Sequence, residues 1–212
     1  MILTSCGASK ISPLVMPSEI TNVSFFEPYS YISYIEKGNR GTFSDSLSNI
    51  TQNALDSILV NNKSKFRLTD KIYYTDTITK NKVAREVEQL AKTIVKNKKL
   101  DGIAVPATID SIMKSKNQRF ALETSAYGFG RKKGNQGNQI AKGAAIGILT
   151  AGMFIPVPIK SNLTIYALIF DSEKNQIAFY KVTTATKEPT DKESIDKLLT
   201  SLFDGYLYQL KQ

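Results

Sequence analysis

The chain has 212 residues, of which 42% are hydrophobic, and a formal net charge of +9; it contains one cysteine and neither histidine nor tryptophan. Without histidine, Ser-His-Asp and Cys-His catalytic sites and the usual zinc sites are excluded, and a single cysteine excludes an internal disulfide. The length suits one globular domain, and no run of 18 or more apolar residues is present that could form a membrane-spanning helix.

The positive charge favours association with polyanions or with anionic lipid head groups. Many of the lysines fall on the polar faces of predicted helices, however, so a solvated basic surface is the preferred interpretation. No nucleic-acid-binding motif with base-stacking aromatic residues is apparent, and nucleic acid is not an expected partner.

The single cysteine lies close to the start of the chain, in the tetrapeptide Leu3-Thr4-Ser5-Cys6. A branched apolar residue three places before a cysteine, with small residues between them, resembles a bacterial lipobox. In proteins with that signal a peptidase cleaves before the cysteine, and its thiol then carries a diacylglycerol thioether. The resemblance therefore implies lipid attachment at Cys6. The alternative is a chance cysteine, since the five preceding residues lack the charged and apolar parts of a signal peptide.

The next segment, residues 7–18, mixes small residues with two prolines and shows no hydrophobic periodicity. This composition is typical of a linker. We therefore expect residues 1–18 to be a lipobox remnant with a flexible tether, and residues 19–212 to form a single α/β domain.

The first half of the domain alternates β-prone runs with two amphipathic helices. The second helix has the clearest pattern, because Val83, Val87 and Leu90 lie on one apolar stripe, which Ala91 and Ile94 continue. The predicted elements are, in chain order, a strand at 21–26, an extension of it or a loop at 29–34, a helix beginning near Ser44 and ending before Asn61, short strands at 66–68 and 71–75 separated by a turn, and a helix over 83–94 followed by lysines 96, 98 and 99.

The second half is expected to consist of strands followed by a terminal helix. The sequence Thr190-Asp191-Lys192-Glu193 has the form of a capping box and is expected to begin that helix. The predicted elements are a buried strand at 101–107, a strand at 118–129 paired against it, a β-hairpin of 162–170 and 176–182 with Asn175 in the turn, and a helix whose apolar face comprises Ile195, Leu198, Leu199, Leu202, Phe203, Tyr206 and Leu210.

Residues 127–139 (YGFGRKKGNQGNQ) combine four glycines with three consecutive cations. The glycine spacing matches neither the dinucleotide fingerprint nor the Walker loop, so a flexible connection is favoured over a nucleotide site. The three cations, Arg131, Lys132 and Lys133, are the candidate contact for an anionic group.

Residues 142–155 (KGAAIGILTAGMFI) are apolar and rich in small side chains. Gly143, Gly147 and Ala151 recur every four residues, a spacing that permits close approach of helices in membranes. Because the segment is too short to span a bilayer, a core helix or loop is favoured over membrane contact or self-association, which remains the alternative.

Together these elements predict an α/β fold, α+β-like, with one mixed sheet packed by about three helices in the order β-α-β-β-α-β-β-insert-β-β-α. This order resembles the domain shared by the curli-secretion channel lipoproteins and the lipoprotein activators of penicillin-binding proteins. The residues that carry the likeness are Cys6, the strand 101–105, and the hairpin from Ile165 to Tyr180, in which Asp171, Ile177 and Phe179 match and Asn175 replaces a glycine. The resemblance implies an envelope lipoprotein that acts through binding surfaces. The long amphipathic hairpins of the secretion channel are not apparent, so a pore is not implied.

The leading hypothesis is a non-catalytic cell-envelope lipoprotein, anchored through Cys6, that serves as a periplasmic binding or assembly module. An envelope protein or a cell-wall component is the expected partner, and no metal or cofactor is expected. The residues after Cys6 lack the Asp of inner-membrane retention signals and the acidic cluster of surface-export signals. By that analogy the domain hangs from the inner leaflet of the outer membrane into the periplasm. In a Gram-positive host it would instead lie on the outer face of the single membrane.

Two other functions remain open at this point. The protein could be an oligomeric secretion or pore component in which residues 143–155 pack between subunits. It could also be a carboxylate-dependent hydrolase, which would require a pair such as Asp101 with Asp110 or Asp171 with Glu173.

Overall fold

The structure, a computed structural model, describes residues 11–38, 40–132 and 160–208. Within these ranges a mixed seven-stranded sheet carries two helices on each face, which confirms the predicted α/β fold. The elements are β1 (Val23–Phe26), β2 (Tyr29–Ile35), β3 (Thr42–Phe43), α1 (Asp45–Asn61), β4 (Leu68–Ile72), α2 (Thr77–Asn97), α3 (Ala107–Ser115), β5 (Phe120–Arg131), β6 (Asn162–Asp171), β7 (Gln176–Ala185) and α4 (Lys192–Phe203).

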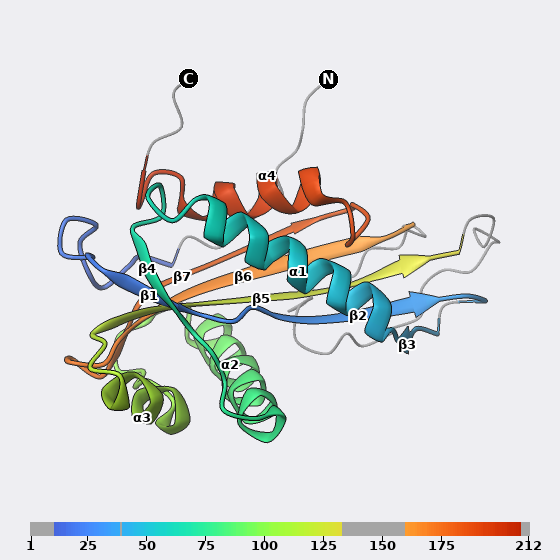
Figure 1. Ribbon diagram of the computed structural model, residues 1–212. Coiled ribbons are helices and arrows are strands. Elements are labelled where there is room, and N and C mark those ends of the chain that lie inside the picture. Colours follow the sequence, from blue (N-terminus) through green and yellow to red (C-terminus); the bar gives the residue numbers. More distant parts are fainter. Residues whose placement is uncertain (1–10, 39, 133–159, 209–212) are drawn as a thin grey trace.

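Strand β5 is the centre of the sheet. On one side it pairs in parallel with β1 along its first residues and with β2 along its last, and on the other side it pairs antiparallel with β6. Three outer strands complete the sheet. Strand β4 pairs in parallel with β1, whereas β3 pairs antiparallel with β2 and β7 pairs antiparallel with β6. Figure 1 shows α1 and α4 on one face of this sheet and α2 and α3 on the other.

Strands β1 and β2 follow the same side of β5 and differ by one residue in register. Phe25 lies opposite Leu122 and Tyr29 opposite Ser125. The four residue steps from 25 to 29 therefore lie beside only three steps of β5. Pro28 stands in the interruption, where it has no N–H to donate to a ladder. The segment 29–34, expected as an extension or a loop, therefore extends the β1 direction as a separate strand.

The hydrophobic core forms two layers, one on each face of the sheet, because successive side chains of a strand point to opposite faces. Leu122 of β5 belongs to the layer beneath α1 and α4, and Ala121 belongs to the layer beneath α2 and α3. The predicted stripe of α2 is confirmed as its contact surface. Its buried residues are Val83, Ala84, Val87, Leu90, Ala91 and Ile94.

Helix α1 begins as predicted. Ser44 is its N-cap, with the side-chain oxygen accepting a hydrogen bond from the Leu47 N–H. The hydroxyl of Thr51 donates to the Pro189 carbonyl at 2.8 Å, which joins α1 to the segment that precedes α4. The helix continues through Asn61, one residue further than predicted.

The buried strand predicted at 101–107 is wrong. Residues 101–106 form a turn and an irregular segment, and Ala107 then begins α3, so the described residues contain four helices rather than about three. Pro106 is the N-cap of α3, and the Val105 N–H donates to the Asn175 side chain at 3.1 Å instead of to a strand. The apolar side chains of this segment pack beneath helices, which a short apolar run does not distinguish from a buried strand. Strand β5, which was expected to pair with residues 101–107, pairs instead with β1, β2 and β6.

Two boundaries also differ from prediction. The strands expected at 66–68 and 71–75 are one edge strand, β4, whose exposed side tolerates the polar residues that suggested a turn.

The N-cap of α4 is Asp191 rather than Thr190, and the helix ends at Phe203. Tyr206, expected on the helix face, follows Gly205 at φ 76° and stacks on Phe179 with ring centroids 4.4 Å apart. Leu210 lies outside the described residues.

The β6–β7 hairpin is confirmed, with Asn175 in the left-handed region at φ 48°. The strand predicted at 118–129 is confirmed as β5, which continues through Arg131 and so takes in residues 127–131 of the expected flexible connection. Gly128 lies opposite Leu163, where the backbones approach so closely that a side chain would collide with the Asn162 carbonyl. The glycine signal here therefore indicates a close strand contact.

Candidate functional site

Several residues singled out from the sequence lie outside the described part of the chain. These are Cys6, Lys133 and the apolar segment 143–155. Their proposed roles in lipid attachment, anion contact and subunit packing stay predictions. In the ranges that are described, no helix is both long and apolar enough to cross a membrane.

The other two predicted cations, Arg131 and Lys132, lie at the end of β5. The Arg131 guanidinium donates to the Gly38 carbonyl, and the Lys132 ammonium is 3.2 Å from the Glu36 carboxylate. Both side chains thus tie the end of β5 to the segment after β2. Lys132 is exposed, and its partner Glu36 is an exposed carboxylate, so contact with an external anion stays a prediction for this end of the sheet.

Residues 11–18, called here the N-terminal strap, cross the β7 edge of the sheet. Ile11 packs against the core layer beneath α2 and α3, whereas Val15 is 3% exposed in the layer beneath α1 and α4. Between them the Leu14 N–H donates to the Ala178 carbonyl of β7 at 3.1 Å. The strap therefore passes from one face of the molecule to the other around an edge strand.

The strap is held at its far end as well. The Tyr206 hydroxyl donates to the Val15 carbonyl at 2.7 Å. The Arg67 guanidinium donates to the Pro17 carbonyl and, at 3.1 Å, to the Ile20 carbonyl. Residues 7–18 were expected to form a flexible tether. These contacts hold the second half of that segment against the domain.

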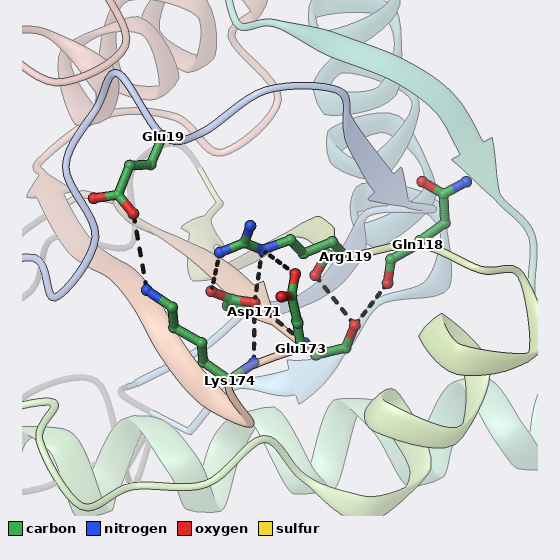
Figure 2. Close-up of polar contacts among 7 residues, drawn as sticks. Glu19, Gln118, Arg119, Asp171, Glu173 and Lys174 are labelled. Carbon is green, nitrogen blue, oxygen red and sulfur yellow. Dashed lines mark hydrogen bonds and ion pairs between the residues drawn. The ribbon is translucent and has the colours of Figure 1, made fainter.

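The turn of the β6–β7 hairpin is organised by Asp171, whose side chain is fully buried (Figure 2). The Arg119 guanidinium donates to both of its oxygens, at 3.2 and 3.3 Å, and the N–H groups of Glu173 and Lys174 donate to Oδ1. The hydrogen bond to Asp171 raises the pKa of Arg119. Glu173 also lies 3.0 Å from the same guanidinium, and Lys174 lies 3.8 Å from Glu19, which follows the strap.

These contacts bear on the carboxylate pair Asp171 and Glu173. The two groups are close, but they share one cation, and Asp171 also accepts hydrogen bonds from the backbone of the turn. The second pair has separate partners, because Asp110 is 2.7 Å from Lys114 and Asp101 is 3.9 Å from a neighbouring lysine. Each of the four carboxylates thus has a basic partner, and the hydrolase hypothesis gains no support from them.

A polar network lies at the interruption between β1 and β2. The Glu27 carboxylate accepts hydrogen bonds from the Lys80 ammonium at 2.9 Å and the Gln52 amide at 2.8 Å. Gln52 belongs to α1 and Lys80 to α2, so this network joins helices from opposite faces around the sheet edge beyond the end of β4.

A second carboxyl group, Glu123 of β5, is buried on the α2 and α3 face. It is 1% exposed; the Ser125 hydroxyl donates to Oε1 at 2.5 Å, while Oε2 has no hydrogen-bond partner among the described residues. Burial raises the pKa of Glu123 to about 7. The hydroxyl groups of Tyr74 and Tyr127 are also buried, which raises their pKa values, with a further increase from the Glu123 charge. The site can hold a proton near neutral pH.

Sequence reasoning missed Glu123, Glu27 and the strap. For Glu123 a signal exists, because it is the single charged residue in residues 120–129 (FALETSAYGF), a run otherwise suited to a buried strand. A charge in such a position predicts a buried carboxyl. Nothing local marks the other two, since their contacts come from segments distant in the chain.

No family model matches the chain, and no curated protein matches it. Among solved structures, it is similar to the PelC dodecamer from Paraburkholderia phytofirmans, with a TM-score of 0.44 and 10% identity over 95% of each chain. It is also similar to the LpoB C-terminal domain from Salmonella enterica, with a TM-score of 0.32 and 10% identity over 81% of this chain and 93% of that chain. For protein XCC0632 from Xanthomonas campestris the TM-score is 0.34, with 7% identity over 93% of this chain and 87% of that chain. At such scores and identities a likeness identifies neither a shared activity nor a shared partner.

Proposed function

We propose that this protein is a lipid-anchored accessory protein of the bacterial cell envelope, and that its α/β domain acts by binding a protein or cell-wall partner rather than by catalysis. The observation that carries the proposal is the tetrapeptide Leu3-Thr4-Ser5-Cys6, which matches a lipobox at all four positions and holds the single cysteine of the chain. Ile11, five residues later and the first residue that the structure describes, already packs against the core of the domain.

An acyl chain contributes about 0.8 kcal/mol per buried methylene group, so a cysteine that carries several chains anchors a protein stably. Anchorage restricts the domain to the neighbourhood of the membrane, where its net positive charge favours encounter with anionic partners. The inner leaflet of an outer membrane, facing the periplasm, is the proposed location.

The choice of binding over catalysis rests on the chemistry of the side chains. The chain has no histidine, and the carboxylates that could form a catalytic pair are held in ion pairs, as the contact of Asp171 with Arg119 illustrates. Glu123, which could hold a proton, is 1% exposed and cannot meet a substrate without movement of the residues that bury it.

The test is the intact mass of the protein purified from its native membrane after expression with its full upstream sequence. We expect a mature chain that starts at Cys6 and carries added acyl mass. In the Cys6→Ala variant we expect loss of lipid labelling and release from the membrane fraction, while Ser9→Ala, a control beyond the lipobox, should behave as the wild type. A Cys6→Ala protein that stays membrane-bound with unchanged lipid labelling would contradict the proposal.

The alternative, an oligomeric secretion or pore component, rests on the spacing of Gly143, Gly147 and Ala151. Light scattering of the purified lipoprotein in detergent distinguishes the two proposals. A monomer at high concentration would contradict the oligomer, and a defined larger species that is lost in Gly147→Leu would favour it.

A further inference from the structure

We propose that the N-terminal strap, with the cations beside it, is the surface of the domain that lies against an anionic lipid bilayer. The inference rests on the proposed function, because it takes Cys6 as the site of the lipid. It goes further in assigning one orientation of the domain to the membrane and naming the side chains that touch it.

The first argument is the length of chain between lipid and domain. Cys6 and Ile11 are five residues apart. An extended chain spans at most about 3.6 Å per residue, so Ile11, which packs against the core, lies within roughly 18 Å of the lipidated cysteine. A free tether through Ser18 would reach more than twice as far by the same measure. Because the strap packs on the domain, the distance that the chain allows between Cys6 and the domain is less than half of that for a free tether.

The second argument is that the strap cannot swing about one attachment point. Ile11 is packed on one face of the sheet and Val15 on the other, with the Leu14 N–H bonded to β7 between them. A segment that is held on both faces keeps Ile11, where the anchor joins the domain, beside the β7 edge. The β7 edge and the strap are therefore the part of the domain that a short anchor brings to the bilayer.

The third argument is the chemistry of the exposed side chains. Leu14 is 39% exposed and Met16 is 67% exposed, so the strap presents apolar groups to the outside. Three cations accompany the strap and the segments that hold it. They are Arg67, which binds the Pro17 carbonyl; Lys174, which is 3.8 Å from Glu19; and Lys65, whose ammonium lies 4.3 Å from the Tyr208 ring centre, two residues from the tyrosine that binds Val15. Apolar side chains flanked by cations suit the boundary between anionic head groups and acyl chains.

The chain offers a matched control for this surface. Ile78, in the first turn of α2, is an apolar side chain that is 80% exposed. It follows the carboxyl end of β4, whereas Arg67, which binds the strap, immediately precedes the other end of that strand. Met16 and Ile78 are thus similar in exposure to solvent and different in their predicted distance from the membrane.

The experiment places a nitroxide spin label at each position of the full-length lipoprotein. Because acylation consumes the single native thiol, Met16→Cys and Ile78→Cys each provide one reactive cysteine. The labelled proteins are reconstituted in vesicles of phosphatidylethanolamine and phosphatidylglycerol, and the collision rates of the label with oxygen and with a water-soluble nickel chelate are measured. We expect the label at 16 to lose contact with nickel and gain contact with oxygen, while the label at 78 stays accessible to nickel.

The mass of each labelled protein shows whether a failure concerns the lipid anchor at Cys6 or the membrane-facing surface at the strap. If the acyl mass is present and the label at 16 meets nickel as often as the label at 78, the membrane-facing surface is wrong although the lipid anchor stands. If the acyl mass is absent, the anchor itself is wrong and the surface falls with it. Replacement of phosphatidylglycerol by neutral lipid should reduce the difference between the two positions, because head-group charge then no longer attracts the cations.

Discussion

The carbonyl oxygen of Asn162 occupies the space where a side chain on Gly128 would begin. The two residues belong to adjacent antiparallel strands, β6 and β5, and a Cβ atom at position 128 would stand well inside van der Waals contact of that oxygen. Backbone atoms of a central strand pair cannot move away as the end of a flexible side chain can. The central pairing of the sheet therefore requires glycine at this position.

We expect Gly128→Ala to lower the free energy of unfolding by about 1 to 3 kcal/mol, the usual cost of overpacking in a well-packed interior. Gly130→Ala is the matched control, because its Cβ would meet the nearest atoms at 3.6 Å, an ordinary contact. Urea denaturation followed by circular dichroism measures both. Equal stability of the two variants would show that β5 and β6 can separate without cost.

The buried carboxyl of Glu123 predicts a dependence of stability on pH. Its folded-state pKa, about 7, lies above the ordinary value of 4.5, so the folded state retains a proton that the unfolded state loses. The contribution of Glu123 to stability is therefore fully present below pH 4.5 and is lost as pH rises through about 7, by up to about 3 kcal/mol at 1.36 kcal/mol per pKa unit.

Glu123→Gln should remove this contribution, because the amide does not titrate. The quantity to measure is the difference in unfolding free energy between wild type and variant from pH 4 to 8, with Glu36→Gln as an exposed control. We expect the wild type to lose stability relative to Glu123→Gln as pH rises. A difference that stays constant over this range would contradict a buried, protonated Glu123.

Two carboxylates that contact the same guanidinium should differ in their importance. Asp171 is fully buried and accepts hydrogen bonds from the turn backbone, whereas the side chain of Glu173 is 65% exposed. We expect Asp171→Asn to cost about 1.5 to 3 kcal/mol of stability, since it weakens charge-assisted hydrogen bonds to a buried side chain, and Glu173→Gln to cost under about 1 kcal/mol. Thermal denaturation of both variants tests the difference. Similar melting temperatures would mean that the turn does not depend on Asp171.

The strap should contribute to stability through Val15 rather than through Met16, although the two are adjacent. Val15 is 3% exposed and Met16 is 67% exposed. Truncation of Val15 to Ala removes two buried methyl groups, which should cost about 2 kcal/mol, while Met16→Ala should be nearly neutral.

Hydrogen exchange provides the local measurement for the same pair of variants. The Leu14 N–H, which bonds to the Ala178 carbonyl, should exchange faster in Val15→Ala and remain protected in Met16→Ala. Rapid exchange of this amide in the wild type would show that the strap is not held on β7. It would also remove the short-anchor argument for the orientation of the domain.

Prediction from sequence succeeded where a residue's structure depends on its near neighbours. The stripe of α2 follows from helical periodicity, the start of α1 from the capping side chain of Ser44, and the β6–β7 turn from an asparagine that tolerates a positive φ. Prediction failed for residues 101–107, because a short apolar run becomes buried equally well in a strand or beneath a helix. Pro106 and the tertiary contact with Asn175 decide between them.

Sequence alone is enough for the α/β class, the hairpin, the absence of histidine chemistry and the lipobox-like cysteine. The tertiary contacts show which strands pair with β5, why Gly128 is required, and that Glu123 is buried beside Tyr74 and Tyr127. They also decide the course of the strap, whose contacts with Arg67, Ala178 and Tyr206 join residues far apart in the chain. Periodicity and capping are local properties, whereas burial and close backbone contact depend on the segments that the fold brings together.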